Sequence, residues 1–255
     1  MAIFNDLPLE LVLAAACVTF LGGFVKGAVG FAMPLIMVAG LSFFLSPQLT
    51  VATLILPVAL ANLMQAGRHG LNEALEAGRE HWRYLLIVCV AILLSAQLLI
   101  YLDPADFYLI LGVPVVFLTL IQLVGVQFHV PPARRRLVEW SVGALAGGMG
   151  GLTGTWGPPT VLYLMALGTE RQRQMLVQGL VYGLGAAMLL VAHLYSGVLN
   201  RNTWQLSAAM LIPATLGMYI GFRMGDRLNA ARLRQVTLLV LLLGGLNLIR
   251  RGLIG

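Results

Sequence analysis

The feature that most constrains this chain is a series of apolar stretches, each about as long as a bilayer is thick. A helix needs about 20 mostly apolar residues to cross the hydrocarbon core. Seven stretches meet this length: Leu7–Val25, Pro47–Ala66, Tyr84–Leu102, Phe107–Val126, Gln174–Val198, Trp204–Phe222 and Leu233–Ile249. Three shorter apolar stretches are typical of steep, broken or re-entrant helices: Phe31–Leu45, Val138–Met149 and Pro158–Leu167. We therefore predict an all-α polytopic membrane protein with ten segments.

The composition agrees with a bilayer as the solvent. Of the 255 residues, 59% are hydrophobic and only 10% are charged, whereas a soluble domain is about 25% charged. The net charge of +6 could indicate nucleic-acid binding, but no basic patch is interleaved with aromatic residues. Cys17 and Cys89 lie inside apolar stretches, so we expect small buried residues and no disulfide or metal site. The N-terminus has no basic region, which favours a retained helix over a cleaved signal peptide.

The arginines orient the segments in the membrane. If the N-terminus lies outside, ten alternating segments place twelve arginines in four inside loops and three arginines outside. The inside loops are Gly67–Arg83, Gln127–Leu137, Gly168–Arg173 and Arg223–Arg234. This bias follows the positive-inside rule, and only the Arg250–Arg251 pair argues against it. Two re-entrant hairpins in place of full crossings would leave the topology unchanged.

The two halves of the chain carry similar glycine-rich motifs. A shift of 125 residues places "GGFVKGAVGFAMP" (Gly22–Pro34) on "GGMGGLTGTWGPP" (Gly147–Pro159), and Phe31 then falls on Trp156. A short apolar arm and a long helix follow each motif, so each half has five segments. Because five is odd, the second copy must be inverted in the membrane. We predict two inverted repeats, residues 1–126 and 138–255, joined by a cytoplasmic linker over residues 127–137.

Inverted repeats with matching glycine and proline breaks are typical of transporters with a binding site near the bilayer midplane. A break leaves backbone N–H groups without helical partners. Such groups must face a cavity, water or a ligand, because hydrocarbon cannot satisfy them. The helix that follows each break also begins with positive dipole charge. Two breaks that meet from opposite sides would frame a small electropositive cavity for an anion.

Lys26, the only lysine in the chain, lies in the first motif between glycines. A charge in mid-membrane costs roughly 3 kcal/mol or more, so such a residue usually has a function. An ammonium group in the cavity would supply a point charge for the anion. In the alternative interpretation, Lys26 lies near a helix end and extends its ammonium group to the lipid headgroups.

Other polar and aromatic residues of the motifs and the helices after them complete the candidate site. Phe31 and Trp156 could form gates or apolar walls of the cavity, or pack without a functional role. Asn62 and Gln178 lie on the long helices after each motif and could face the cavity, although interhelical hydrogen bonds would also explain them. The candidate substrate-binding residues are Lys26, Gly27, Gly30, Phe31, Asn62, Thr153, Thr155, Trp156, Gln178 and Tyr182.

The sequence also argues against several functions. All ten acidic residues lie in loops or near segment ends, so no carboxylate proton relay is visible in mid-membrane. No nucleotide-binding loop, zinc spacing or convincing Ser/His/Asp set occurs, and glycine patterns such as "GALAGGMGG" follow no strand. We expect no enzyme activity, cofactor, metal or nucleic-acid partner; the expected partners are a small anionic substrate and the lipid bilayer.

The motifs resemble those of the TauE/SafE family of sulfite exporters. The matching stretches are "GGFVKGAVGFAMPLIM" (Gly22–Met37) and "GALAGGMGGLTGTWGPPTVLYLMALG" (Gly143–Gly168), and the pattern of long and short segments agrees along the chain. The resemblance implies transport of sulfite, sulfonates or related small anions across a bacterial inner membrane. It also implies a substrate site at Lys26 and at the residues of both motifs. Many family members have more glycine where this chain has "TWGPP", which leaves the substrate open.

We therefore expect an exporter of a small sulfur-containing anion that works by alternating access around a midplane site. One alternative is an anion channel that uses the same electropositive cavity. Another is a transporter of a different small organic anion. A membrane-embedded partner subunit without transport of its own is a third alternative, but such a subunit would not need a polar, glycine-broken midplane.

Overall fold

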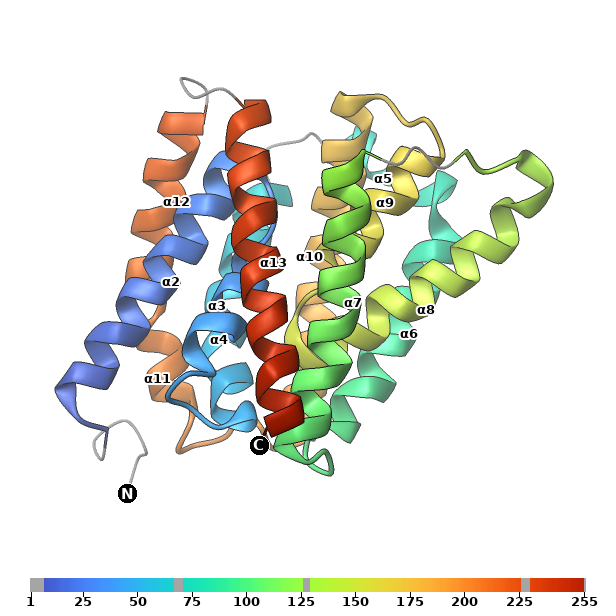
Figure 1. Ribbon diagram of the computed structural model, residues 1–255. Coiled ribbons are helices and arrows are strands. Elements are labelled where there is room, and N and C mark those ends of the chain that lie inside the picture. The colour runs from blue at the N-terminus through green and yellow to red at the C-terminus, as the bar shows by residue number, and fades with distance from the viewer. Residues whose placement is uncertain (1–6, 67–70, 126–128, 226–229, 255) are drawn as a thin grey trace.

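The computed structural model describes residues 7–66, 71–125, 129–225 and 230–254, and regular structure in these ranges is entirely helical (Figure 1). The first half contains α2 (Leu9–Val29), α3 (Met33–Leu41), α4 (Pro47–Ala66), α5 (Leu71–Glu80), α6 (Trp82–Leu98) and α7 (Pro104–Val124). The second half contains the short η1 (Pro132–Arg134), α8 (Arg135–Thr153), α9 (Gly157–Ala166), α10 (Arg171–Tyr195), α11 (Trp204–Ala209), α12 (Leu211–Gly225) and α13 (Ala230–Ile254).

Six helical stretches among the described residues are long and apolar enough to cross a membrane. They are Leu9–Val29, Pro47–Gln65, Pro104–Val124, Arg173–Tyr195, Trp204–Gly225 and Gln235–Ile254, and α6 is a shorter apolar helix. The prediction of an all-α polytopic membrane protein is confirmed. The amphipathic α5 was not predicted as a separate segment, because it is polar and lies among loop arginines.

The glycine-rich motifs do not break the helices where they begin. The expected short segment Val138–Met149 is part of α8, which continues without interruption for 19 residues. In the first half, α2 passes through Gly22 and Gly23 and ends only at Val29. Glycine in a helix costs roughly 1 kcal/mol relative to alanine, so packing must offset this cost. The prediction of a short segment at Val138–Met149 is wrong, because the glycines of the motif remain helical and α8 continues through them.

Close helix packing explains these glycines. The Cα of Gly23 on α2 lies so near α12 that an added Cβ would collide with the carbonyl oxygen of Ala214. Gly147 on α8 is in the same situation against the carbonyl oxygen of Val88 on α6. Small residues allow membrane helices to approach closely and gain van der Waals contact. Two tight helix pairs, α2 with α12 and α8 with α6, result.

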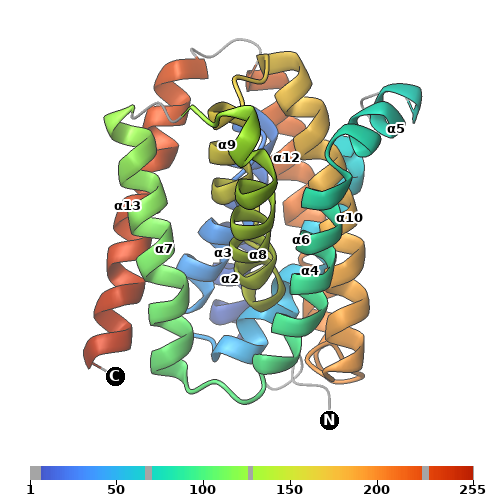
Figure 2. The ribbon, with the colours of Figure 1, turned by 90° about the vertical axis from the view of Figure 1, so that its right-hand side faces the viewer.

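Each motif ends in a sharp turn that folds the chain back on itself. The chain turns at Gly30–Ala32 between α2 and α3, and again at Gly154–Trp156 between α8 and α9. Figures 1 and 2 show α3 toward the end of the bundle where α2 begins and α13 ends, and α9 toward the opposite end, where α5 lies. We call these the terminal end and the α5 end. The two helical hairpins thus enter the bundle from opposite ends.

The main helix contacts of one half match those of the other half. The first helix of each hairpin pairs with a helix of the opposite half: α2 with α12, and α8 with α6. The second helices, α3 and α9, contact α13 and α7 respectively, and α4 packs on α10. The turn glycines Gly30 and Gly154 lie 124 residues apart, one fewer than the shift used to align the motifs. Phe31 therefore matches Thr155, and Trp156 matches Ala32. The expected equivalence of Phe31 and Trp156 is displaced by one residue, because sequence letters alone do not fix where the helix ends.

Arg68, Arg227 and residues 127–128 of the expected linker lie outside the described residues.

Both cysteines are free, but Cys17 is exposed on the outside of α2 and Cys89 is half-buried. The expectation of a buried Cys17 is wrong, since its side of α2 points away from the bundle.

Candidate functional site

A small cavity lies where the two turns meet in the interior of the bundle. It is lined by Lys26, Phe31, Ala32, Pro34, Leu35, Asn62, Gly154, Thr155, Trp156, Gly157, Pro158 and Tyr182. The space open to the centre of a water molecule is about 20 Å³, which is enough for one or two waters. A larger anion would require the lining side chains to move apart. In this structure the cavity is therefore too small to hold sulfite or a sulfonate.

Lys26 is the charged group of this cavity. Its side chain is 3% exposed, although it lies in the last turn of α2. The ammonium Nζ donates a hydrogen bond of 2.5 Å to Oδ1 of Asn62 on α4, and it lies 5.1 Å from the ring centroid of Tyr182 on α10. Among the described residues, no carboxylate forms an ion pair with Lys26. A buried cation with neutral partners has strong attraction left for an anion.

The turn backbone places the lining residues. Gly30 ends α2 with φ 93°, and Gly154 ends α8 with φ 71°, both in the left-handed region that favours glycine. Ala32 also has a positive φ of 79° and caps the start of α3. Alanine in this region is strained by roughly 1–3 kcal/mol, and such strain concentrates at functional sites. The strained residue is one of those that line the cavity.

The beginnings of α3 and α9 both face the cavity, since the residues that start each helix belong to its lining. Their dipoles thus contribute positive charge to the cavity from two directions. Prolines reduce the number of free donors, because Pro34 in the first turn of α3 and Pro158 and Pro159 in that of α9 have no N–H. The lysine and the dipoles, more than a set of N–H groups, give the cavity its positive character.

Hydroxyl and indole groups complete the lining. The hydroxyls of Thr153 and Thr155 are hydrogen-bonded to each other, and Thr153 also donates to the carbonyl oxygen of Met149. The hydroxyl of Tyr182 lies 3.5 Å from the carbonyl oxygen of Gly157. Trp156 is buried, with its side chain against Gly150 and Gly185. Both turns and the helices after them therefore contribute to one site.

The structure brings six of the ten candidate residues into the lining: Lys26, Phe31, Asn62, Thr155, Trp156 and Tyr182. The other four lie outside it. Gly27 packs against the backbone of α12, Gly30 forms the turn, and Thr153 supports Thr155 from behind. Gln178 is buried on α10, one turn before Tyr182, but it does not line the cavity.

The list of candidate residues left out six lining residues, although the family resemblance pointed to both motifs as a whole: Ala32, Pro34, Leu35, Gly154, Gly157 and Pro158. All of them lie in the quoted motifs, at the turns and in the first helical turn after each. A correct position for the helix ends would have found them, since the residues just after a break are those that face the cavity.

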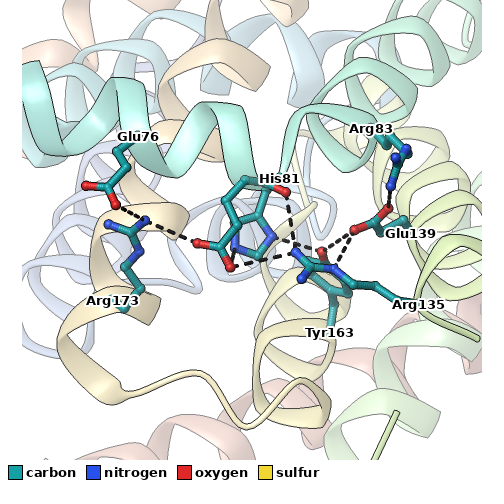
Figure 3. Close-up of polar contacts among 8 residues, drawn as sticks. Glu76, His81, Arg83, Arg135, Glu139, Tyr163 and Arg173 are labelled. Carbon is teal, nitrogen blue, oxygen red and sulfur yellow. Dashed lines mark hydrogen bonds and ion pairs between the residues drawn. The ribbon is translucent and has the colours of Figure 1, made fainter. Parts of the chain in front are cut away.

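A second group of polar side chains, with a buried centre and a more exposed rim, lies at the α5 end and joins five helices (Figure 3). We call it the α5-end cluster; it consists of Glu76, Glu80, His81, Arg83, Arg135, Glu139, Tyr163 and Arg173. At its centre Glu139 is 1% exposed and accepts from Arg135 at 2.9 Å and Arg83 at 3.5 Å. Glu80 pairs with Arg173 at 3.1 Å and with Arg135 at 3.7 Å. Sequence reasoning placed these charges in loops or near segment ends and did not predict their pairing, because their partners come from distant helices.

Burial and neighbouring charges together shift the pKa values of His81 and Glu80. Burial lowers the pKa of His81, and the neighbouring Glu80 carboxylate opposes this only in part. Burial raises the pKa of Glu80, but a hydrogen bond from Arg173 and the nearby positive charges outweigh it, so the net pKa is lowered. Near neutral pH the histidine is therefore uncharged and the carboxylate ionised. Within the described residues, no three metal-ligating side chains gather into a metal site.

Comparison with known proteins places the chain in a family. The model of the family described as sulfite exporter TauE/SafE matches residues 15–248, which include both turns and every residue that lines the cavity. No curated protein and no solved structure matches the chain. Because the family match covers far more than half of the chain, the protein belongs to the sulfite exporter TauE/SafE family, which implies a membrane transporter of sulfite or related anions.

Proposed function

We propose that the protein exports a small sulfur-containing anion, such as sulfite or an organosulfonate, by alternating access around the cavity at Lys26. The observation that carries this proposal is the buried ammonium group of Lys26, which has an amide and an aromatic ring as its partners. A bound anion would supply the missing negative charge. The beginnings of α3 and α9 would add favourable dipole charge from both sides.

The exchange of helix contacts between the halves supports two inverted repeats, residues 1–126 and 138–255, around this site. Repeats of this kind allow one half to rock against the other while the site stays near the midplane. The cavity is too small for such an anion in this structure, so its lining side chains must separate before an anion can bind, as alternating access requires. The membrane potential, negative inside, would favour outward movement of an anion by about 2.3 kcal/mol per charge and 100 mV.

The test is binding of sulfite to the purified protein and to three variants, measured by calorimetry. Lys26→Gln and Lys26→Ala remove the charge and should weaken binding by well over tenfold, because losing a desolvated charge partner costs about 2–5 kcal/mol. Lys26→Arg keeps the charge but needs more room and a planar donor geometry, so it should restore binding only in part. Sulfate, thiosulfate, sulfoacetate, taurine and simple carboxylates, tested in the same way, would define the substrate.

Arg136→Gln is a matched control, because it removes an exposed cation outside the cavity. It should bind sulfite like the wild type. Wild-type affinity in Lys26→Gln would overturn the assignment of the anion site. A lysine that only reaches toward lipid headgroups would give the opposite order, with Lys26→Arg like the wild type and Lys26→Gln reduced mainly in yield.

We also propose that the protein lies in a bacterial inner membrane with its N-terminus in the periplasm and its α5 end in the cytoplasm. The positive-inside rule supports this orientation, since arginines gather at the α5 end. A cysteine placed in the Asp103–Asp106 turn should react with an impermeant thiol reagent added from the periplasm. A cysteine in the Arg134–Arg136 segment should not. The reverse labelling pattern would invert the proposed orientation.

A further inference from the structure

A column of buried hydroxyl, phenol and imidazole groups runs from the cavity toward the α5 end. It begins at Thr160 on α9, whose hydroxyl donates to the carbonyl oxygen of the cavity residue Trp156 at 2.7 Å. The same hydroxyl is 2.9 Å from the phenol oxygen of Tyr84 on α6. The ring of Tyr84 is stacked on that of Tyr163, with 4.3 Å between the ring centroids. Polar groups thus continue along α9 through an otherwise apolar interior.

The column ends in the α5-end cluster. The hydroxyl of Tyr163 is 2.9 Å from Nδ1 of His81 and 3.4 Å from a carboxylate oxygen of Glu139. This hydroxyl has one proton. If it donates to Glu139, it accepts from Nδ1–H of the uncharged histidine. Tyr163 therefore ties α9 to the beginning of α6 and to α8 (Figure 3).

We propose that this column is the closed route between the anion cavity and the α5 end, and that Tyr163, held by Glu139 and His81, is its gate. The proposal rests on the proposed function at Lys26. Buried hydroxyls that hydrogen-bond to one another in the closed state can donate to an anion when the helices separate. Arg83 and Arg135, each about one-third exposed, lie at the outer mouth and would attract anions toward it.

The test measures access to the cavity from each side of the membrane. In a variant with Cys17 and Cys89 replaced by serine, Thr155→Cys places a single thiol in the cavity lining. Membrane vesicles of both orientations are treated with an impermeant methanethiosulfonate, and the rate of modification is followed. Adding Tyr163→Phe keeps the stacked ring but removes the hydroxyl that contacts Glu139 and His81. The rate reports the population of the open route.

Modification should become about tenfold faster, the factor for one hydrogen bond to a charged group. The increase should occur only from the side where the Arg134–Arg136 segment is accessible. Tyr84→Phe, which loses the neutral bond to Thr160, should give a smaller increase of about two- to fivefold on the same side. If Tyr163→Phe does not fold, as judged by size-exclusion chromatography, the result for Tyr84→Phe alone decides the test.

Tyr108→Phe is the matched control, because Tyr108 is equally buried but lies on α7 near Arg251, away from the cluster. It should leave the rate unchanged. Unchanged modification rates in both Tyr163→Phe and Tyr84→Phe, or equal increases from the two sides of the membrane, would overturn the gate. These rates do not depend on anion binding, whereas the calorimetry on Lys26 variants does. Failure of the gate is therefore distinguishable from failure of the anion site.

Discussion

The two helical hairpins, α2 with α3 and α8 with α9, have the same backbone plan but different surroundings. Each ends its first helix at a glycine with positive φ, and each uses glycines to approach a partner helix. Around α9, however, Thr160, Tyr163 and Glu139 form polar contacts. Counting back 124 residues gives Ile36, Ala39 and Ala15, all apolar.

The region beside α3 differs accordingly. Instead of an ionic cluster, an apolar pocket of about 350 Å³ borders α3, and Ile36, Ala39 and Leu35 are among its lining residues. Leu35 also lines the cavity at Lys26. Similar hairpins thus border the cavity in two ways, with apolar side chains toward the terminal end and with hydrogen bonds and ion pairs toward the α5 end. The two sides should respond differently to loss of charge, to pH and to small substitutions.

The largest expected effect tests what the hairpins share. Gly23→Leu and Gly147→Leu each place a side chain against the backbone of the partner helix. Each should destabilise the fold by about 3 kcal/mol, the upper part of the usual range for overpacking. The yield of monodisperse protein in size-exclusion chromatography measures this. Gly148→Leu is the control, since nothing lies within 4 Å of its added Cβ. If Gly147→Leu leaves the yield of monodisperse protein unchanged, the two hairpins do not pack in equivalent ways.

A medium effect is expected where the hairpins differ. Glu139→Leu leaves Arg135 and Arg83 without their shared carboxylate and should lower stability by about 2 kcal/mol. This is less than the 3–5 kcal/mol for a fully buried broken pair, because both arginines are partly exposed and reach water. Thermal unfolding measures it, with Glu76→Leu as an exposed control that changes little. Equal stability of the two variants would show that α9 does not depend on the cluster.

The smallest expected effect is a pH dependence at the α5 end. His81 faces Glu80 of α5, Arg135 and Glu139 of α8, Tyr163 of α9 and Arg173 of α10. Because burial lowers its pKa, the unfolded chain binds a proton more readily than the folded protein. Its contribution to stability is therefore complete above pH 6.5 or so and is lost as the pH falls through the lowered pKa.

The slope cannot exceed about 1.4 kcal/mol per pH unit for one proton. Melting temperatures between pH 7.5 and pH 5 should fall more in the wild type than in His81→Gln, which lacks the titrating group. Identical pH profiles of the two proteins would remove His81 from the explanation.

Much of this protein follows from the sequence alone. The apolar lengths predict the membrane helices, and the single lysine between glycines marks a cavity residue, because few explanations exist for an ammonium group in an apolar segment. Phe31, Thr155 and Trp156, which also line the cavity, were candidates in the sequence because they lie beside the glycine and proline breaks. Helix ends were less predictable: glycine both weakens a helix and allows close packing, and only the neighbouring helix decides which effect dominates at Gly23 and Gly147.

Only the tertiary structure decided which distant side chains meet. Lys26 and Asn62 are 36 positions apart, and Glu139 meets Arg83 across 56 positions. No local pattern encodes such pairs, because they depend on how whole helices pack. Gln178 and Tyr182 lie on one face of α10 and were equal candidates by sequence, yet only Tyr182 reaches the cavity. The gate at Tyr163 likewise exists only because α9 folds back beside α6 and α8.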